Sequence, residues 1–293
     1  MNDILSDVLP EGYNKAVDLD RVGETNFLYG GLNIVYGIDG TGKSYQTSAS
    51  FVDEDVVYFD TDGSNGRLFV EHCNKNGVHY INYETVATFT PKNKLLDNTF
   101  KIIGKIVAHN RAKSNDFRPV FIVDSLTSIA EGQEINNAEK ISPLLYLLNN
   151  HASIHNYCLI LIDHATEHFE KGKHIGFKLE GNAGAKKRTS VTVNRYVPAD
   201  VHNPEFGGTF YCERARGNNS GLRKGDEYLV TKVNKAMALE WIKRRNPNWL
   251  VDGMTKSEMT IKTKNLKDKW VRAFIDDIFG KSVVDKITNF KIR

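Results

Sequence analysis

Short apolar runs alternate along the chain with longer stretches in which apolar side chains recur at helical spacing. The runs at 56–59, 120–123 and 159–162 have the length and the β-branched or aromatic content of buried strands. Residues 95–111 and 141–150 carry apolar side chains as expected for helices. This alternation predicts a central sheet of mainly parallel strands that are connected by helices.

After residue 188 the pattern changes to strands in close succession. Runs at 189–196, 209–213 and 227–233 are rich in strand-forming residues, and turn residues separate them. Close succession of this kind predicts antiparallel pairing. The whole pattern therefore predicts an α/β fold with a mainly parallel central sheet, helices on both faces and an antiparallel C-terminal extension.

Shifts in composition divide the chain into three parts. We expect a short polar lead-in over 1–24, one large domain over 25–253 and a lysine-rich tail over 254–293. The residue pattern of the tail predicts an amphipathic helix at 270–279. This helix either packs on a neighbouring molecule or a nucleic acid, or presents a solvated lysine face.

Charge and cysteine content limit the binding partners and the redox compartment that we expect for the protein. The net charge is only +3 over 293 residues, so a nucleic-acid site would require local clustering of basic side chains. The three cysteines are widely spaced without metal-ligand pairing, which favours a reducing, cytoplasmic setting. Neither a membrane-spanning apolar run nor a signal peptide is evident, so no membrane partner is expected.

Residues 37–44 read Gly-Ile-Asp-Gly-Thr-Gly-Lys-Ser and match the phosphate-binding loop G-x-x-x-x-G-K-[ST] at each fixed position. The flanks supply the strand and the helix that this loop requires. In such a loop Lys43 reaches the β- and γ-phosphates, and Ser44 offers its hydroxyl to Mg²⁺. The motif predicts ATP and Mg²⁺ as ligands. The residues expected to bind the nucleotide are Gly37, Ile38, Asp39, Gly40, Thr41, Gly42, Lys43, Ser44 and Tyr45.

Polar residues at the ends of three predicted strands complete the candidate site. Asp124 follows a buried strand and is expected to hold Mg²⁺ together with Ser44, unless it only caps the next turn. Asp62 is expected to position the attacking water if its strand neighbours the loop strand, with Asp60 as the competitor and a turn aspartate as the alternative. His164 is expected to sense the γ-phosphate, the alternative being a core histidine.

The segment at about 166–190 combines glycines with basic and aromatic residues. A mobile loop of this composition suits a single-stranded nucleic-acid backbone whose bases stack on aromatic rings, although an ordinary flexible loop has similar composition. The basic residues expected to bind nucleic acid are Lys171, Lys173, Lys178, Lys186, Lys187 and Arg188.

Arg214 and Arg216 occupy alternate positions of a predicted hairpin. Arginine stabilises the charge on a transferring phosphoryl group, often from a neighbouring subunit, so we expect both to act on a neighbour's ATP. The alternative is a basic hairpin at the surface.

Together these segments, over roughly residues 25–235, resemble the RecA-type ATPase core. The stretch Ile-Asp-His-Ala-Thr at 162–166 is similar to the His-Ala-Ser stretch of plasmid RepA hexameric helicases. The Arg-Ala-Arg-Gly-Asn stretch at 214–218 resembles a basic pair in DnaB-type replicative helicases that reaches a neighbour's ATP. Short phage recombinases with little more than a RecA core are also similar. Two departures are Asp62, where the superfamily normally has glutamate, and Arg214, where DnaB proteins have lysine.

The resemblance implies an ATPase that works as a homo-oligomer, either a ring, expected to be a hexamer, or a filament. ATP would lie between subunits, and hydrolysis would drive a helicase or translocase on single-stranded DNA. One alternative is a recombinase or annealing protein that forms filaments on single strands. Another is a nucleotide-gated switch or scaffold, which slow turnover with Asp62 would favour.

Overall fold

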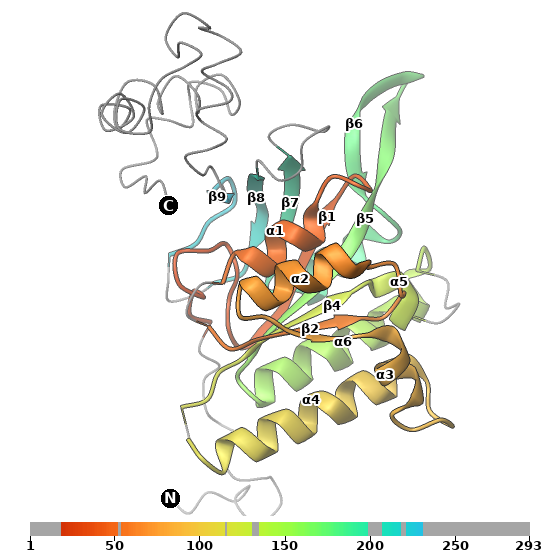
Figure 1. The fold of residues 1–293 in the computed structure, drawn as a ribbon. Coiled ribbons are helices and arrows are strands. Elements are labelled where there is room, and N and C mark those ends of the chain that lie inside the picture. The colour runs from red at the N-terminus through yellow and green to blue at the C-terminus, as the bar shows by residue number, and fades with distance from the viewer. Residues whose placement is uncertain are drawn as a thin grey trace, which may run out of the picture.

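A computed structural model of the chain describes residues 19–51, 54–114, 116–130, 135–198, 207–217 and 221–230. These residues form a nine-stranded sheet with the order β3-β2-β4-β5-β1-β7-β8-β9, and β6 pairs with β5 outside that path (Figure 1). The strands are β1 Gly31–Gly37, β2 Val56–Asp60, β3 His79–Ile81, β4 Val120–Asp124, β5 Cys158–Glu170, β6 Lys173–Leu179, β7 Thr192–Pro198, β8 Gly208–Ala215 and β9 Glu227–Val230. The helices are α1 Lys43–Ala49, α2 Arg67–Lys75, α3 Tyr83–Thr88, α4 Leu95–Arg111, α5 Leu126–Ile129, α6 Ala138–Ile154 and α7 Ala183–Thr189.

The strands from β3 to β7 in this order are parallel, whereas β8 and β9 pair antiparallel beyond β7. The prediction of an α/β fold with a mainly parallel central sheet and an antiparallel extension is confirmed. Among the parallel strands, β1, β2 and β4 are buried along their whole length, which explains why their sequences are continuous apolar runs.

Helices cover both faces of the sheet, and each face has its own core. On one face, side chains such as Phe59 and Phe121 pack with residues of α4 and α6, including Ile103 and Leu145. On the other face, alternate strand residues pack with α2, for example through Phe69. The two-residue periodicity of strands thus divides each apolar run between two cores.

Three features differ from the sequence predictions. The segment expected to be a mobile loop after His164 is a β-hairpin followed by α7, because β5 continues to Glu170 and pairs with β6. The strand expected at 189–196 begins at Thr192, since α7 extends to Thr189. Finally, β2 does not neighbour β1, because β4 and β5 lie between them.

Residues 19–30 pack against the sheet. Val22 and Phe27 are buried in one of the two cores, and Asn33 of β1 exchanges hydrogen bonds with the backbone of Leu28 at 2.8 and 2.9 Å. Residues 19–24 therefore belong to the packed part of the molecule. The tail expected at 254–293 and the end of the strand expected at 227–233 lie outside the described residues.

No helix in the described ranges combines the length and the apolar character needed to cross a bilayer.

Candidate functional site

The segment that matches the phosphate-binding loop connects β1 to α1 with a tightly turned backbone. Gly40 and Gly42 have φ values of +72° and +86°, which glycine adopts without the steric cost of a Cβ. At Gly37 a Cβ would lie 2.8 Å from the carbonyl oxygen of Tyr196, so only glycine fits at the end of β1. The glycines of the motif are thus required by the loop's conformation and by its packing.

Lys43 points back over its own loop and is buried. Its Nζ donates to the carbonyl oxygens of Gly37 and Ile38, both at 2.9 Å, and lies 3.2 Å from Oδ1 of Asp39. All three acceptors belong to the segment that precedes the lysine. The ammonium group is therefore held at the centre of the loop.

Asp124, at the end of β4, contacts the first turn of α1. The Ser44 hydroxyl donates to Oδ2 of Asp124 at 2.5 Å, and the Tyr58 hydroxyl donates to the same oxygen. Burial raises the pKa of Asp124, while the hydrogen bonds from Ser44 and Tyr58 oppose that shift. A buried carboxylate therefore faces the phosphate-binding loop, as the sequence predicts.

The hydroxyl of Ser44 and the carboxylate of Asp124 are a fitting donor pair for Mg²⁺. This ion prefers oxygen ligands and keeps several waters, so it takes only one or two side chains from the protein. Both oxygens lie beside the loop that contains Lys43. No cluster of three or more His, Cys, Asp or Glu side chains with metal-ligand geometry occurs in the described part of the chain.

Asp60 and Asp62 have different surroundings. Asp60 ends β2 and is buried, and its carboxylate accepts from Tyr80 at 2.6 Å and from the backbone of Gly63 at 2.8 Å. Asp62 is exposed, and its carboxylate accepts from the backbone of Ser64 at 2.9 Å. The hydrogen bonds of Asp60 therefore stabilise the turn that follows β2. Asp62 is the freer carboxylate of the two, but the condition set for its role is not met, because β2 does not neighbour the loop strand.

His164 lies next to the phosphate-binding loop because it pairs in register with Gly37. Its Nδ1 is 2.5 Å from Oδ1 of Asp39, and its side chain is partly exposed. The structure therefore places His164 beside the loop, where the role expected for it requires it to be. The hydrogen bond to Asp39 could not be read from the sequence.

Beyond His164, β5 and β6 form a two-stranded arm over Ala165–Leu179 that projects from the body of the molecule (Figure 1). Lys171 and Gly172 form its turn with φ values of +50° and +77°, as in the two-residue turns typical of hairpins. Two short runs separated by Lys-Gly are the sequence signal for this hairpin.

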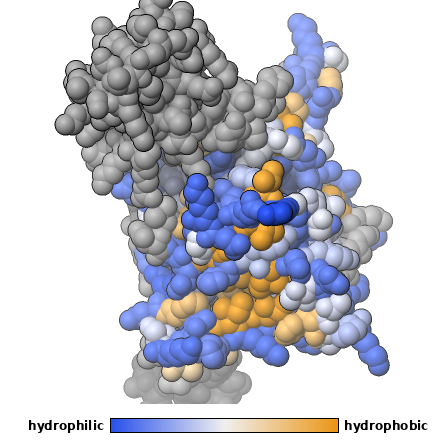
Figure 2. Space-filling view, in the orientation of Figure 1, coloured by the Kyte–Doolittle hydropathy of each residue, from blue (hydrophilic) through white to orange (hydrophobic). Residues whose placement is uncertain are grey.

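One set of aromatic rings runs along the arm. The rings of Phe169 and His174 are 5.4 Å apart, and those of His174 and Phe177 are 5.3 Å apart. Phe169 is 55% exposed and Phe177 37% exposed, and hydrophobic residues are visible on the otherwise mainly hydrophilic arm (Figure 2). A register shift between His168 and Phe169 accompanies this arrangement.

The six basic residues expected to bind nucleic acid differ in their exposure to solvent. Those accessible to a ligand are Lys171, Lys173 and Lys178 on the arm and Arg188 on α7. Lys187 lies 3.1 Å from Glu213 and is partly exposed. For Lys186 the expectation is wrong, because its side chain is fully buried in an ion pair with Asp163. Its Nζ also donates to the carbonyl oxygen of Glu180 at 2.8 Å, so this lysine joins α7 to the base of the arm.

Arg214 and Arg216 lie at the edge of the sheet opposite the phosphate-binding loop. Because β8 is antiparallel to β7, its last residue, Ala215, pairs with Thr192 at the start of β7. Burial lowers the pKa of Arg214, and the charge of Arg216 lowers it further. The two guanidinium groups are thus electrostatically coupled, and neither lies beside the loop of its own chain.

Tyr45 contributes mainly to packing. Its ring contacts those of Phe69 and His72 on α2, at 5.2 and 4.2 Å. The side chain thereby fixes α1 against α2 beside the loop.

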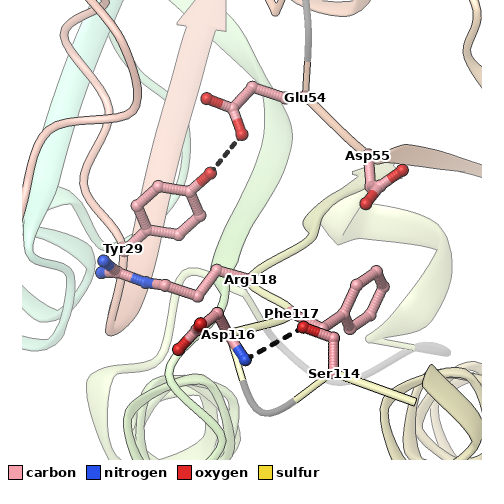
Figure 3. Close-up of a pocket in the computed structure, with 7 residues that line it drawn as sticks. All are labelled: Tyr29, Glu54, Asp55, Ser114, Asp116, Phe117 and Arg118. Carbon is pink, nitrogen blue, oxygen red and sulfur yellow. Dashed lines mark hydrogen bonds between the residues drawn. The ribbon is translucent and has the colours of Figure 1, made fainter. Parts of the chain in front are cut away.

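A pocket of about 440 Å³ lies at the edge of the sheet opposite the phosphate-binding loop, before the starts of β1, β2 and β4 (Figure 3). The Tyr29 hydroxyl donates to Glu54 at 2.6 Å, and the guanidinium of Arg118 lies 4.2 Å from the centre of the Tyr29 ring. Arg118 also lies 3.3 Å from Asp20. These polar groups are paired with one another and tie residues 20–29 to the sheet.

No protein-family model matches the chain, and no curated protein is significantly similar to it in sequence.

Proposed function

We propose that the protein is an ATPase of the RecA type, a motor that binds single-stranded DNA and works as a homo-oligomer. The observation that carries this proposal is the 2.5 Å contact between Ser44 and Asp124 beside the buried Lys43. A lysine, a hydroxyl and a strand-end carboxylate in this order are the groups that phosphate-binding loops use for a nucleoside triphosphate and Mg²⁺.

Each group has a role in this proposal. Lys43 binds the phosphates, and Ser44 and Asp124 hold Mg²⁺, which when bound neutralises charge on the phosphate oxygens. Asp62 orients the attacking water, and His164 responds to the γ-phosphate. Their positions support these roles, because Asp62 follows two residues after Asp60, which pairs with Asp124, and His164 pairs with Gly37.

The position of the two arginines supports a role on the ATP of a neighbouring subunit. Arg214 and Arg216 lie at the opposite edge of the sheet from their own loop, so they can act on ATP only in a second copy of the chain. A ring or a filament, in which each copy repeats the same contact, supplies that second copy.

The arm over Ala165–Leu179 is the proposed contact with single-stranded DNA. It begins next to His164, and its exposed rings offer stacking surfaces to bases. The arm carries three lysines and two glutamates, Glu167 and Glu170. The excess of positive charge is therefore small, and stacking distinguishes the arm more than charge does.

A nucleotide-gated switch is the second candidate function. It is favoured by Asp62, which is short, exposed and hydrogen-bonded to its own turn at Ser64. A carboxylate in that state supports slow hydrolysis.

Hydrolysis assays on the full-length chain test the proposal. We expect Mg²⁺-dependent ATP hydrolysis that single-stranded DNA stimulates at low salt. Lys43→Ala should lower the rate by about 100-fold or more, since it removes a charge that stabilises the transition state. Lys101→Ala, at an exposed position on α4, is the control and should have no effect.

Other results of these assays separate the alternatives. Tight ATP binding with negligible turnover, with or without DNA, would support the switch. Strand displacement on a forked duplex would favour a helicase over a recombinase. A chain that binds no nucleotide would overturn the proposal.

A further inference from the structure

Asp39 is the third residue of the phosphate-binding loop, and it joins the two groups assigned above to the γ-phosphate. Its Oδ1 lies 3.2 Å from Nζ of Lys43 and 2.5 Å from Nδ1 of His164. Lys43 comes from the start of α1 and His164 from β5, so one carboxylate oxygen bridges two elements. The loop pattern itself leaves this position free.

The bridge is electrostatically favourable for the ionised carboxylate. Partial burial pushes the pKa of Asp39 upward, but the hydrogen bond from His164 and the charge of Lys43 outweigh it, so the pKa is lowered. Asp39 is thus a negative oxygen ligand held between a lysine and a histidine. A terminal phosphate oxygen would make the same two contacts.

We propose that Asp39 is a specificity-determining residue that competes with the γ-phosphate for Lys43 and His164, and so weakens binding of a nucleoside triphosphate relative to a diphosphate. This inference rests on the proposed function of the loop. A diphosphate leaves the bridge in place, because Lys43 can exchange one of its two backbone acceptors for a β-phosphate oxygen while its third donor hydrogen keeps Asp39. A triphosphate must displace the carboxylate, since two anions cannot share one position.

Displacement is sterically possible because the Asp39 side chain is 72% exposed. When the carboxylate leaves, Lys43 and His164 are both released from it at once. Because of Asp39, the contacts of Lys43 and His164 therefore depend on whether a third phosphate is bound. It is a positioning residue, since it acts through Lys43 and His164.

Equilibrium binding of ADP and of a non-hydrolysable ATP analogue, each with Mg²⁺, tests this inference on the full-length chain. In Asp39→Asn the preference for the ATP analogue over ADP should rise by about fivefold, the size expected for loss of a partly exposed ion pair. Affinity for ADP should change by less than about twofold. Asp39→Ser should behave in the same way, because it also removes the charge.

Asp116→Asn is the matched control, since it removes one exposed carboxylate at the opposite edge of the sheet. It should leave the preference unchanged. Equal effects of Asp39→Asn on both nucleotides, or an equal shift in the control, would overturn the inference and leave the proposed function intact. Absence of nucleotide binding in the unsubstituted chain would overturn both.

Discussion

The two halves of β5 belong to one strand but have opposite surroundings. The first half, Cys158–Asp163, is buried at the centre of the sheet between β4 and β1. The second half pairs only with β6 among the described strands, and most of its side chains are at least partly exposed. The change occurs at Asp163 and His164. One strand thus connects the core of the fold to a projecting surface, and its two halves are expected to serve stability and binding respectively.

The largest expected effect is on the buried half, at the ion pair of Lys186 with Asp163. Lys186→Met leaves the Asp163 carboxylate buried without its partner, which should cost about 3–5 kcal/mol of unfolding free energy. Chemical denaturation measures this cost. Lys187→Met is the matched control, because its pair with Glu213 is partly exposed and is worth about 0–1 kcal/mol. Similar losses in both variants would contradict the division of β5 into two regions.

The second effect is on the projecting half. Phe169→Ala combined with Phe177→Ala should change the unfolding free energy by less than about 0.5 kcal/mol, since both rings are exposed. If the arm binds single-stranded DNA, each lost ring removes stacking of about 1–3 kcal/mol, so affinity should fall at least tenfold. Fluorescence anisotropy with a labelled oligonucleotide measures this.

Leu147→Ala is the control for the double variant, because Leu147 is 54% exposed on α6, away from the arm. It should leave DNA affinity unchanged. If the double variant unfolds more easily than Leu147→Ala, the arm is part of the stabilising core, and the two halves of β5 do not differ as stated.

The smallest expected effect is a pH dependence of the unfolding free energy that arises just before the buried half of β5. The Nδ1 atom of His151 lies 2.7 Å from the hydroxyl of Tyr157, the residue before β5. Burial lowers the pKa of His151 to about 4 from its ordinary value of 6.5, and the charge of His155 adds to the shift. Between these values the unfolded chain binds more protons than the folded one. Stability from this source is therefore complete above about pH 6.5 and falls as the pH drops toward 4.

Urea denaturation at pH 7 and pH 5 checks this pH dependence. His151→Gln should reduce the difference in unfolding free energy between the two pH values. His174→Gln, on the exposed arm, should leave it unchanged. An unaltered difference in His151→Gln would show that other groups cause the pH dependence.

The sequence predicts the local parts of the site well. The phosphate-binding loop is contiguous, and the strand before Asp124 is a simple apolar run, so both are visible without a structure. The contact between Asp124 and Ser44 is harder to predict from the sequence. Three neighbouring strands contain or end with a buried aspartate, namely Asp60, Asp124 and Asp163, and only their contacts show that Asp124 faces Ser44.

The errors have a common physical cause, which is long-range pairing. Lys186 appeared to belong to a basic loop because its partner, Asp163, lies 23 positions earlier. The adjacency of β2 and β1, which was the condition for the role of Asp62, is absent because strand order depends on how helices cross the sheet. The arm was expected to be a loop because glycines and charged residues interrupt its short apolar runs, so the pairing of β5 with β6 is not evident from local pattern alone.

The arm also has a mechanical consequence that follows from its length. Six residues of β5, from Ala165 to Glu170, extend about 20 Å at the usual rise of a strand. The arm is anchored at one end, where Lys186 binds both Asp163 and the backbone of Glu180. A tilt of about 10° at that anchor moves the tip by about 3 Å, which is close to the rise of one strand residue. The hairpin therefore converts a small rotation beside the phosphate-binding loop into a displacement of several ångströms at its tip.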